Sequence, residues 1–163
     1  MTGANSCVVE TRGLGRRFGS VWAVRAVDLK IGRGEIFGLV GPDGAGKTTL
    51  LQLLAAILDP SEGDCRVLGF DTVRQAPSVT TRIGYMAQGF TLYARLTVAE
   101  NLAFAARVRG VSPADLAARR ESLLAMAGLA PFLHRREGAL SGGMRKKLAL
   151  CTNLIHQPPL LFL

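Results

Sequence analysis

A glycine-rich octapeptide between an apolar run and a helical pattern constrains this chain more than any other stretch. Residues 35–40 have the character of a buried strand, and residues 49–58 show the apolar spacing of a largely buried helix. Glycines allow the amides of the connecting loop to converge on a phosphate at the positive end of the helix. The pattern predicts a phosphate-binding loop made of Gly41, Pro42, Asp43, Gly44, Ala45, Gly46, Lys47 and Thr48.

The side chains of this loop indicate a nucleotide with its metal ion. Lys47 would reach the β and γ phosphates as a point charge, and the Thr48 hydroxyl would ligate Mg²⁺. Thr49 follows in the same helical turn and is counted with the nucleotide contacts. The loop does not define the reaction, since kinases, GTPases and motor ATPases share it.

Length and charge narrow the class of protein. The 163 residues fit one domain, and no run approaches the roughly 18 apolar residues of a membrane span. A net charge of +8 invites a nucleic-acid function, but the basic residues are scattered in short pairs without interleaved aromatic residues. Solvated surface is the favoured interpretation, and anionic lipid heads or RNA are the alternatives.

Strands dominate the first 88 residues and helices the next 60 or so. Strands are expected at 8–11, 27–31, 35–40, 65–68 and 82–86, with residues 16–19 between the first two. Thr97 and Glu100 have the spacing of a capping box at the start of a helix that runs to about Arg109. Ser112 precedes Pro113 at the start of another helix, which runs to about Ala127 and ends at Gly128.

These patterns predict an α/β core with an inserted α-helical subdomain. The core comprises about 1–88 and 157–163, and the helical subdomain about 89–156.

A second glycine motif lies about a hundred residues after the first. Ser141 is placed as a helix cap, and the amides of the glycines that follow could face outward as a second anion site. One nucleotide rarely needs two helix starts from distant parts of a chain. The spacing therefore suggests an isologous dimer in which each copy completes the site of its neighbour. The motif is Leu140, Ser141, Gly142, Gly143 and Met144.

Together the two motifs resemble those of the nucleotide-binding subunits of ATP-binding cassette (ABC) transporters. The second motif is similar to that family's LSGGQ signature, and the likeness covers essentially all 163 residues. The resemblance implies a P-loop NTPase core of mixed sheet with antiparallel N-terminal strands. It also implies ATP and Mg²⁺ as ligands, a homo- or heterodimer of ATP-binding domains, and separate transmembrane subunits or domains as partners.

The resemblance assigns roles to further residues. Phe18 stands where the family has an aromatic that stacks on adenine, although a ring there could instead only pack the sheet. Gln88 stands at the position of the family glutamine that senses Mg²⁺ and the attacking water, although alone it would be a strand-end polar residue. Asp43 replaces the commoner Asn. Met144 replaces the signature Gln, a variant similar to that of some export-type subunits.

The last expected strand, residues 158–163, resembles the Walker B strand of the family. The Asp and Glu that the family places immediately after it are absent from the 163 residues. We therefore expect a full-length protein that is an ATPase and a 163-residue chain that binds nucleotide weakly and lacks turnover.

The sequence and its resemblance therefore favour an ATP-binding transporter subunit, in the export direction, on the cytoplasmic face of the membrane. Nucleic acid is disfavoured as a partner. The alternatives are a soluble ABC ATPase acting on ribosomes or nucleic acid, and an inactive nucleotide-binding fragment.

Overall fold

A computed structural model describes residues 7–87, 89 and 92–163 of the chain. They fall into two compact units, one extending to Ile83 and the other beginning at Gly84. We call them the sheet unit and the helical unit. Gln88 lies outside the described residues.

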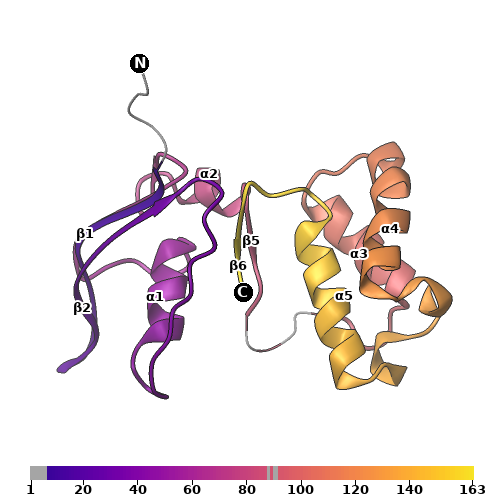
Figure 1. Ribbon diagram of the computed structural model, residues 1–163, viewed down its shortest axis with the longest axis horizontal. Coiled ribbons are helices and arrows are strands. Elements are labelled where there is room, and N and C mark those ends of the chain that lie inside the picture. Colours follow the sequence, from indigo (N-terminus) through magenta and orange to yellow (C-terminus); the bar gives the residue numbers. More distant parts are fainter. Residues whose placement is uncertain (1–6, 88, 90–91) are drawn as a thin grey trace. The chain divides into compact units, whose positions relative to one another are not determined.

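The sheet unit is built on one antiparallel sheet with the strand order β2-β1-β3-β4. Its two long strands, β1 and β2, lie side by side (Figure 1). Buried residues of β1, such as Val9 and Leu14, supply part of its core, and α1 adds Leu50, Leu53 and Leu54. Helix α1 contacts both β2 and β3. The elements are β1 (Cys7–Phe18), β2 (Val21–Gly32), α1 (Lys47–Leu54), β3 (Glu62–Val67), β4 (Phe70–Asp71) and α2 (Ala76–Thr80).

The first two strands are much longer than predicted. Residues 16–18, expected between the strands, belong to β1 because they pair with β2 from Val21 to Val24. The ladder passes through several irregularities, such as the one between Thr11 and Leu14, where the glycine-rich sequence carries little strand propensity. Pairing with β2 and β3 therefore decided the conformation there. Helix α1 also ends earlier than predicted, at Leu54 instead of residue 58.

The predicted buried strand over residues 35–40 is wrong for this structure. The segment has no regular secondary structure, Ile36 is 100% exposed and Val40 is 95% exposed. An apolar run of this kind is stable as a strand only where neighbouring strands bond its backbone and its faces are covered. Among the described residues no strand pairs with 35–40, so this run stays unpaired and exposed.

The helical unit confirms the predicted helices and their caps. Thr97 and Glu100 form the capping box, the Ser112 side chain accepts from the amide of Asp115, and Gly128 ends α4 in the left-handed conformation. Strands β5 and β6 pair in a second, two-stranded sheet. The elements are β5 (Ile83–Tyr85), α3 (Val98–Val108), α4 (Pro113–Ala127), α5 (Gly142–Leu154) and β6 (Leu160–Phe162), with short 3₁₀ turns η1 (Ala130–Phe132) and η2 (Glu137–Ala139).

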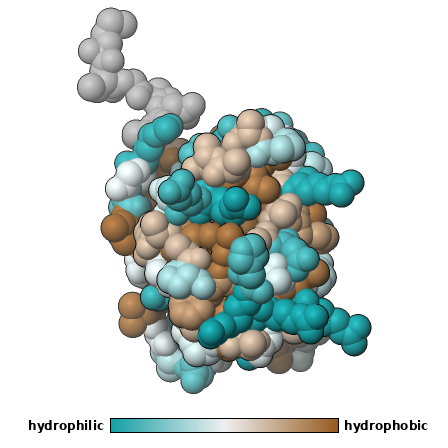
Figure 2. Space-filling model, turned by 90° about the vertical axis from the view of Figure 1, so that its right-hand side faces the viewer, coloured by the Kyte–Doolittle hydropathy of each residue, from teal (hydrophilic) through white to brown (hydrophobic). Residues whose placement is uncertain are grey.

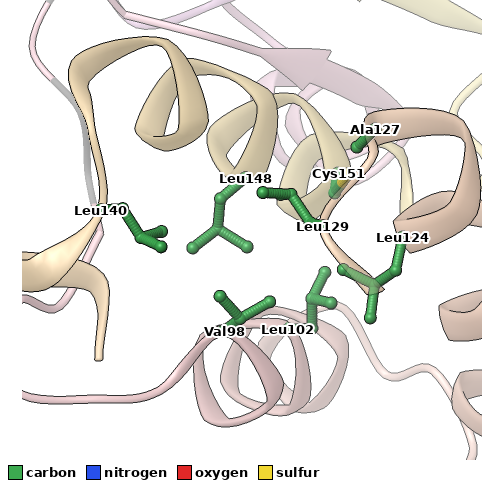
Figure 3. Packing of buried hydrophobic residues seen from close by; sticks show 8 residues of the cluster. All are labelled: Val98, Leu102, Leu124, Ala127, Leu129, Leu140, Leu148 and Cys151. Carbon is green, nitrogen blue, oxygen red and sulfur yellow. The ribbon is translucent and has the colours of Figure 1, made fainter. Parts of the chain in front are cut away.

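One apolar cluster holds the three long helices together (Figure 3). In this cluster the side chains of α3, α4 and α5 point toward one another, and Leu140 joins them from the loop before α5. Its members are Val98, Leu102, Leu124, Ala127, Leu129, Leu140, Leu148 and Cys151. The first residue of the second glycine motif is therefore fixed in the core of the unit.

The outer surface of the helical unit mixes apolar and charged side chains (Figure 2). Exposed apolar residues include Phe104 and Val108 on α3 and Met126 on α4. In the part of the chain that the structure describes, no helix has the length and apolar character needed to cross a bilayer.

Candidate functional site

The first glycine motif forms an exposed loop that leads directly into α1. Gly44 and Gly46 have positive φ angles of 78° and 83°, which residues other than glycine rarely adopt. Gly46 is also the N-cap of α1 and has no side chain to cap it, so the amides of the first helical turn receive no side-chain acceptor there. The loop thus presents unsatisfied donors at the positive end of a helix, which is the geometry that favours a phosphate.

Lys47 is folded back onto its own loop. Its Nζ donates to the carbonyl oxygens of Gly41 and Pro42, each at 2.7 Å, while the amide of Ala45 donates to the Pro42 carbonyl at 3.3 Å. These carbonyls are neutral acceptors, and a phosphate oxygen would offer the ammonium a charged one. A nucleotide would therefore compete for Lys47 on favourable terms.

Gly46 also seats the loop against the hairpin of β1 and β2. A Cβ added at Gly46 would collide with the carbonyl of Ala23 and approach Val24 Cγ2 at 3.4 Å. The close approach of these backbones requires glycine, independently of the φ angle. The residues present therefore fit a phosphate-binding loop that a larger residue at position 46 would displace from the hairpin.

Phe18 lies at the turn end of the same hairpin. It pairs with Val21, two residues before Ala23, so the ring and the loop are supported by neighbouring parts of β2. Phe18 is 48% exposed, which is open enough for a base to stack on it. The guanidinium of Arg16 covers the ring at 4.7 Å from its centroid, and Arg16 Nη1 donates to the Asp59 carbonyl at 2.9 Å.

The remaining predicted loop residues are accessible. Asp43 and Thr48 are exposed, and Thr49 is half-buried. The Thr48 hydroxyl lies in the first turn of α1, where a metal ion bound to a phosphate on the loop would be near it. Gln88, the other predicted Mg²⁺ contact, is outside the described residues.

The second glycine motif is a capped helix start in the helical unit. The Ser141 Oγ accepts from the amide of Met144 at 3.3 Å, as the sequence predicts. Gly142 and Gly143 are exposed, and a Cβ at either would meet no atom within 4 Å. The turn therefore presents open backbone at the start of α5.

Several contacts around these motifs were not foreseen. Arg17 and Arg25 lie over Trp22 at 5.6 and 5.7 Å, and Arg16 lies over Phe18, so aromatic rings do interleave with basic residues on the hairpin, contrary to the sequence interpretation. Residues 16 and 18 lie on the same face of one strand, and this spacing could have revealed the contact between Arg16 and Phe18. No sequence period links Glu137 to Arg145, which form an ion pair at 3.4 Å beside the second motif.

A phosphate loop on a strand-and-helix unit, followed by a helical unit with a capped glycine motif, defines a P-loop nucleotide-binding domain. The ABC transporter family model matches residues 24–163. The chain therefore belongs to the ABC transporter family, as an ATP-binding domain with the α/β P-loop fold that the sequence predicts.

Several curated proteins that are similar to this chain carry transporter names. The chain is 44% identical over 142 residues to the ABC transporter ATP-binding protein NatA of Bacillus subtilis, covering 86% of this chain and 58% of NatA. It is 42% identical over 161 residues to the "Probable multidrug ABC transporter ATP-binding protein YbhF" of Escherichia coli, covering 98% of this chain and 28% of YbhF. It is 38% identical over 156 residues to the spermidine/putrescine import ATP-binding protein PotA of Nitrosomonas europaea, covering 96% and 43%.

Solved structures agree on the fold. The ATP-binding subunit of an ABC transporter superimposes with a TM-score of 0.86 at 26% identity, covering 94% of this chain and 64% of that one. An ATP-binding cassette dimer, in a post-hydrolysis state bound to ADP and Pi, gives 0.80 at 26% identity, covering 94% and 72%. The chain thus spans between about a quarter and three quarters of the length of these proteins.

Proposed function

We propose that this chain is the nucleotide-binding part of a transporter ATPase that works as a pair of ATP-binding domains. In the pair, the Lys47 loop of one subunit and the Ser141 loop of the other enclose one ATP. The observation that carries the proposal is the coexistence, in one chain, of two helix starts that each present amides to an anion. One is seated by Gly46 and the other is capped by Ser141.

Each loop has a distinct role in this arrangement. Lys47 leaves the carbonyls of Gly41 and Pro42 to bind the β and γ phosphates, and adenine stacks on the exposed face of Phe18. The Thr48 hydroxyl and Gln88 hold Mg²⁺, which would neutralise charge on the phosphates. Ser141 Oγ and the amides of Gly142 and Gly143 face the phosphate of the opposite subunit's nucleotide.

The partners follow from the same proposal. Separate membrane-spanning subunits convert closure of the pair into transport, and the chain works from the cytoplasmic face of the membrane. Relatives named for multidrug transport and for spermidine/putrescine import both match this chain, so the export direction rests on Met144 alone.

Turnover needs groups that these 163 residues do not hold. The resemblance puts an acidic metal ligand and a carboxylate base directly after residues 158–163, and we expect ATP binding without turnover from the 163 residues by themselves. Steady-state ATP hydrolysis by the 163-residue chain at a rate close to that of the natural full-length protein would contradict this expectation.

The experiment that tests the proposal uses the natural full-length protein. Lys47→Ala should weaken ATP binding by about 100-fold or more, since it removes the cation that meets the transferred phosphate. Ser141→Arg should leave ATP binding unchanged while blocking closure of the pair and turnover. Equilibrium binding of labelled ATP and steady-state hydrolysis give the two readouts. Native turnover with Ser141→Arg would remove the paired mechanism.

A second candidate function has one observation in its favour. The hairpin carries Arg16, Arg17 and Arg25 against Phe18 and Trp22, and such interleaving of cations with rings suits RNA. A soluble ABC ATPase acting on ribosomes would use it. Co-sedimentation of the natural protein with ribosomes, abolished by Arg25→Glu, would favour this function over transport, whereas recovery with the membrane fraction would favour the transporter.

A further inference from the structure

The helical unit contains a buried acid next to the second glycine motif. Glu137 is only 6% exposed and is one of four buried polar residues among those described. Its Oε1 lies 3.4 Å from Nε of Arg145, while Nη2 of Arg145 contacts the Gly138 carbonyl at 3.5 Å. A buried carboxylate without a partner is strongly unfavourable, so the position of Arg145 is coupled to that of Glu137.

The two partners of this ion pair lie on either side of the second glycine motif, residues 140–144. Glu137 lies three residues before Leu140, and Arg145 lies four residues after Ser141. The backbone amide of Arg145 donates to the Ser141 carbonyl at 2.9 Å, which is the first helical bond of α5. The exposed residues Gly142 and Gly143 therefore belong to a short segment whose two ends are joined by the Glu137–Arg145 ion pair.

The turn that precedes the second glycine motif is hydrogen-bonded to the residues around the start of α3. The amides of Glu137 and Gly138 donate to the carbonyls of Leu96 and Ala94, at 2.8 and 3.0 Å. Two further bonds run the other way, from the amides of Val98 and Ala99 to the carbonyls of Arg135 and Leu133, each at 3.0 Å. The two stretches, 94–99 and 133–138, are thus joined as an irregular ladder.

A second buried polar residue fixes the far side of this ladder. Asn101, 2% exposed, accepts from the Tyr93 amide at 2.9 Å and donates to the carbonyls of Tyr93, Leu96 and Thr97. The stretch 93–97 begins five residues after Gln88. A continuous set of polar contacts therefore runs from the segment that follows Gln88 to the turn that carries Ser141.

We propose that Arg145 is a positioning residue for the Ser141 loop, acting through Glu137. Its side chain joins the start of α5 to Glu137 and Gly138, whose amides bond to the carbonyls of residues 96 and 94. Ser141 and the glycine amides therefore meet the phosphate of the opposite subunit's nucleotide in one orientation. The inference rests on the proposed paired function. Stability of α5 does not explain the arginine, because positive charge is disfavoured near a helix N-terminus.

The test compares variants of the natural full-length protein. Arg145→Gln and Glu137→Gln should each lower kcat by about 10-fold, since small misplacement of a group that meets the transition state has effects of this order or larger. KM and the Kd for ATP should stay within about twofold, because the phosphate loop belongs to the other unit. The double variant should be no slower than either single one, since both remove the same contact.

The matched control is Lys146→Gln, which removes the same charge one residue further on from an exposed side chain. It should leave kcat within about twofold of native. Should Glu137→Gln fail to fold, Arg145→Lys keeps the charge but loses the fork geometry, and an intermediate kcat is expected. A native kcat for folded Arg145→Gln, or loss of ATP affinity in step with kcat, would overturn the proposal.

Hydrogen exchange separates this inference from the function on which it rests. The amide of Met144, held by Ser141 Oγ, should exchange about 10-fold faster in Arg145→Gln than in native protein without nucleotide. If native protein shows no ATP turnover, the proposed function fails whatever the exchange rate. If native protein turns over but Met144 exchange and kcat are both unchanged in Arg145→Gln, only the positioning role fails.

Discussion

The two glycine motifs are held in the fold in very different ways. Around the first, the loop is exposed, the apolar run before it is unpaired, and Lys47 bonds to carbonyls of its own loop. Around the second, Leu140 is buried, Ser141 caps α5, and a ladder of backbone bonds joins the preceding turn to α3. The second motif is fixed by a buried core and by backbone bonds to the start of α3, whereas the first is held by bonds within its own loop and by its close approach to β2.

This contrast suggests a division of work. A loop whose amides lack acceptors gains most from a ligand that supplies them, so nucleotide binding should order the first motif. A turn whose backbone is already bonded changes little on its own and moves as part of its unit. We therefore expect the phosphate loop to respond to ATP and the Ser141 loop to be presented ready-made.

The sharpest way to break the comparison is to add one methyl group to each motif. Gly46→Ala should destabilise the sheet unit by about 3 kcal/mol or more and abolish ATP binding, because its Cβ collides with the Ala23 carbonyl at a positive φ. Gly142→Ala should change stability by about 0.5 kcal/mol or less, since a Cβ there meets open space. Urea unfolding and ATP binding are the measurements. Equal damage from both substitutions would show that the two motifs are equally constrained.

The second prediction contrasts a core leucine with the exposed apolar run. Leu148→Ala should cost about 2–5 kcal/mol, since the side chain is fully buried in the cluster of Figure 3. Ile36→Ala in the 163-residue chain should cost about 0.5 kcal/mol or less, since Ile36 is 100% exposed. Both are read from urea midpoints. A loss of several kcal/mol at Ile36 would mean that residues 35–40 are a covered strand, as their sequence pattern predicts.

That run also shows where sequence reasoning succeeded and where it did not. Caps such as Thr97, Ser112 and Ser141 were predicted correctly because the donor and acceptor lie within three residues of each other. The strand at 35–40 was not, because a pattern reports what a segment could bury and not whether partners are present. The roles of Phe18, Gln88 and the motif side chains toward a ligand stay predictions.

Contacts between residues that are not related by a helical or strand period were also missing from the sequence-based prediction. Glu137 and Arg145 read as ordinary surface charges, since eight residues separate them across a turn and no helical or strand period relates them. Gly46 was assigned to the loop from its motif, but its contact with Ala23 needed the course of β2. In both cases the missing information was which segments pack together.

Thiol labelling compares the opening of the two units within one protein. Burial raises the pKa of Cys65 in the sheet unit and of Cys151 in the helical unit, in each case to about 11. Both thiols are thus buried and mostly protonated at pH 8, so labelling of either one requires local opening. Differences in labelling rate therefore report local opening. We expect Cys151 to label about 10-fold more slowly than Cys65 in a Cys7→Ser background, measured by mass spectrometry. Faster labelling of Cys151 would reverse the contrast between the units.

The smallest expected effect concerns acid, to which the two units should respond alike. In the helical unit the Thr97 amide, followed by its hydroxyl, lowers the pKa of Glu100. In the sheet unit the amides of Arg74 and Val73 lower the pKa of Asp71. A carboxyl with a folded-state pKa below its unfolded value stabilises the fold above the unfolded value, near about 4. That stabilisation is lost as the pH falls through the lower folded-state pKa.

Urea unfolding of native protein, Glu100→Ala and Asp71→Ala between pH 7 and pH 3 would measure this. The deficit of each variant relative to native should be largest at neutral pH and shrink in acid, because protonation removes from native protein what the substitution has already removed. Because Glu100 is exposed and Asp71 is only half-buried, water weakens both interactions and the deficits should be small. A deficit that shrinks for Glu100 but not for Asp71 would mean that charge, as well as packing, distinguishes the helical unit from the sheet unit.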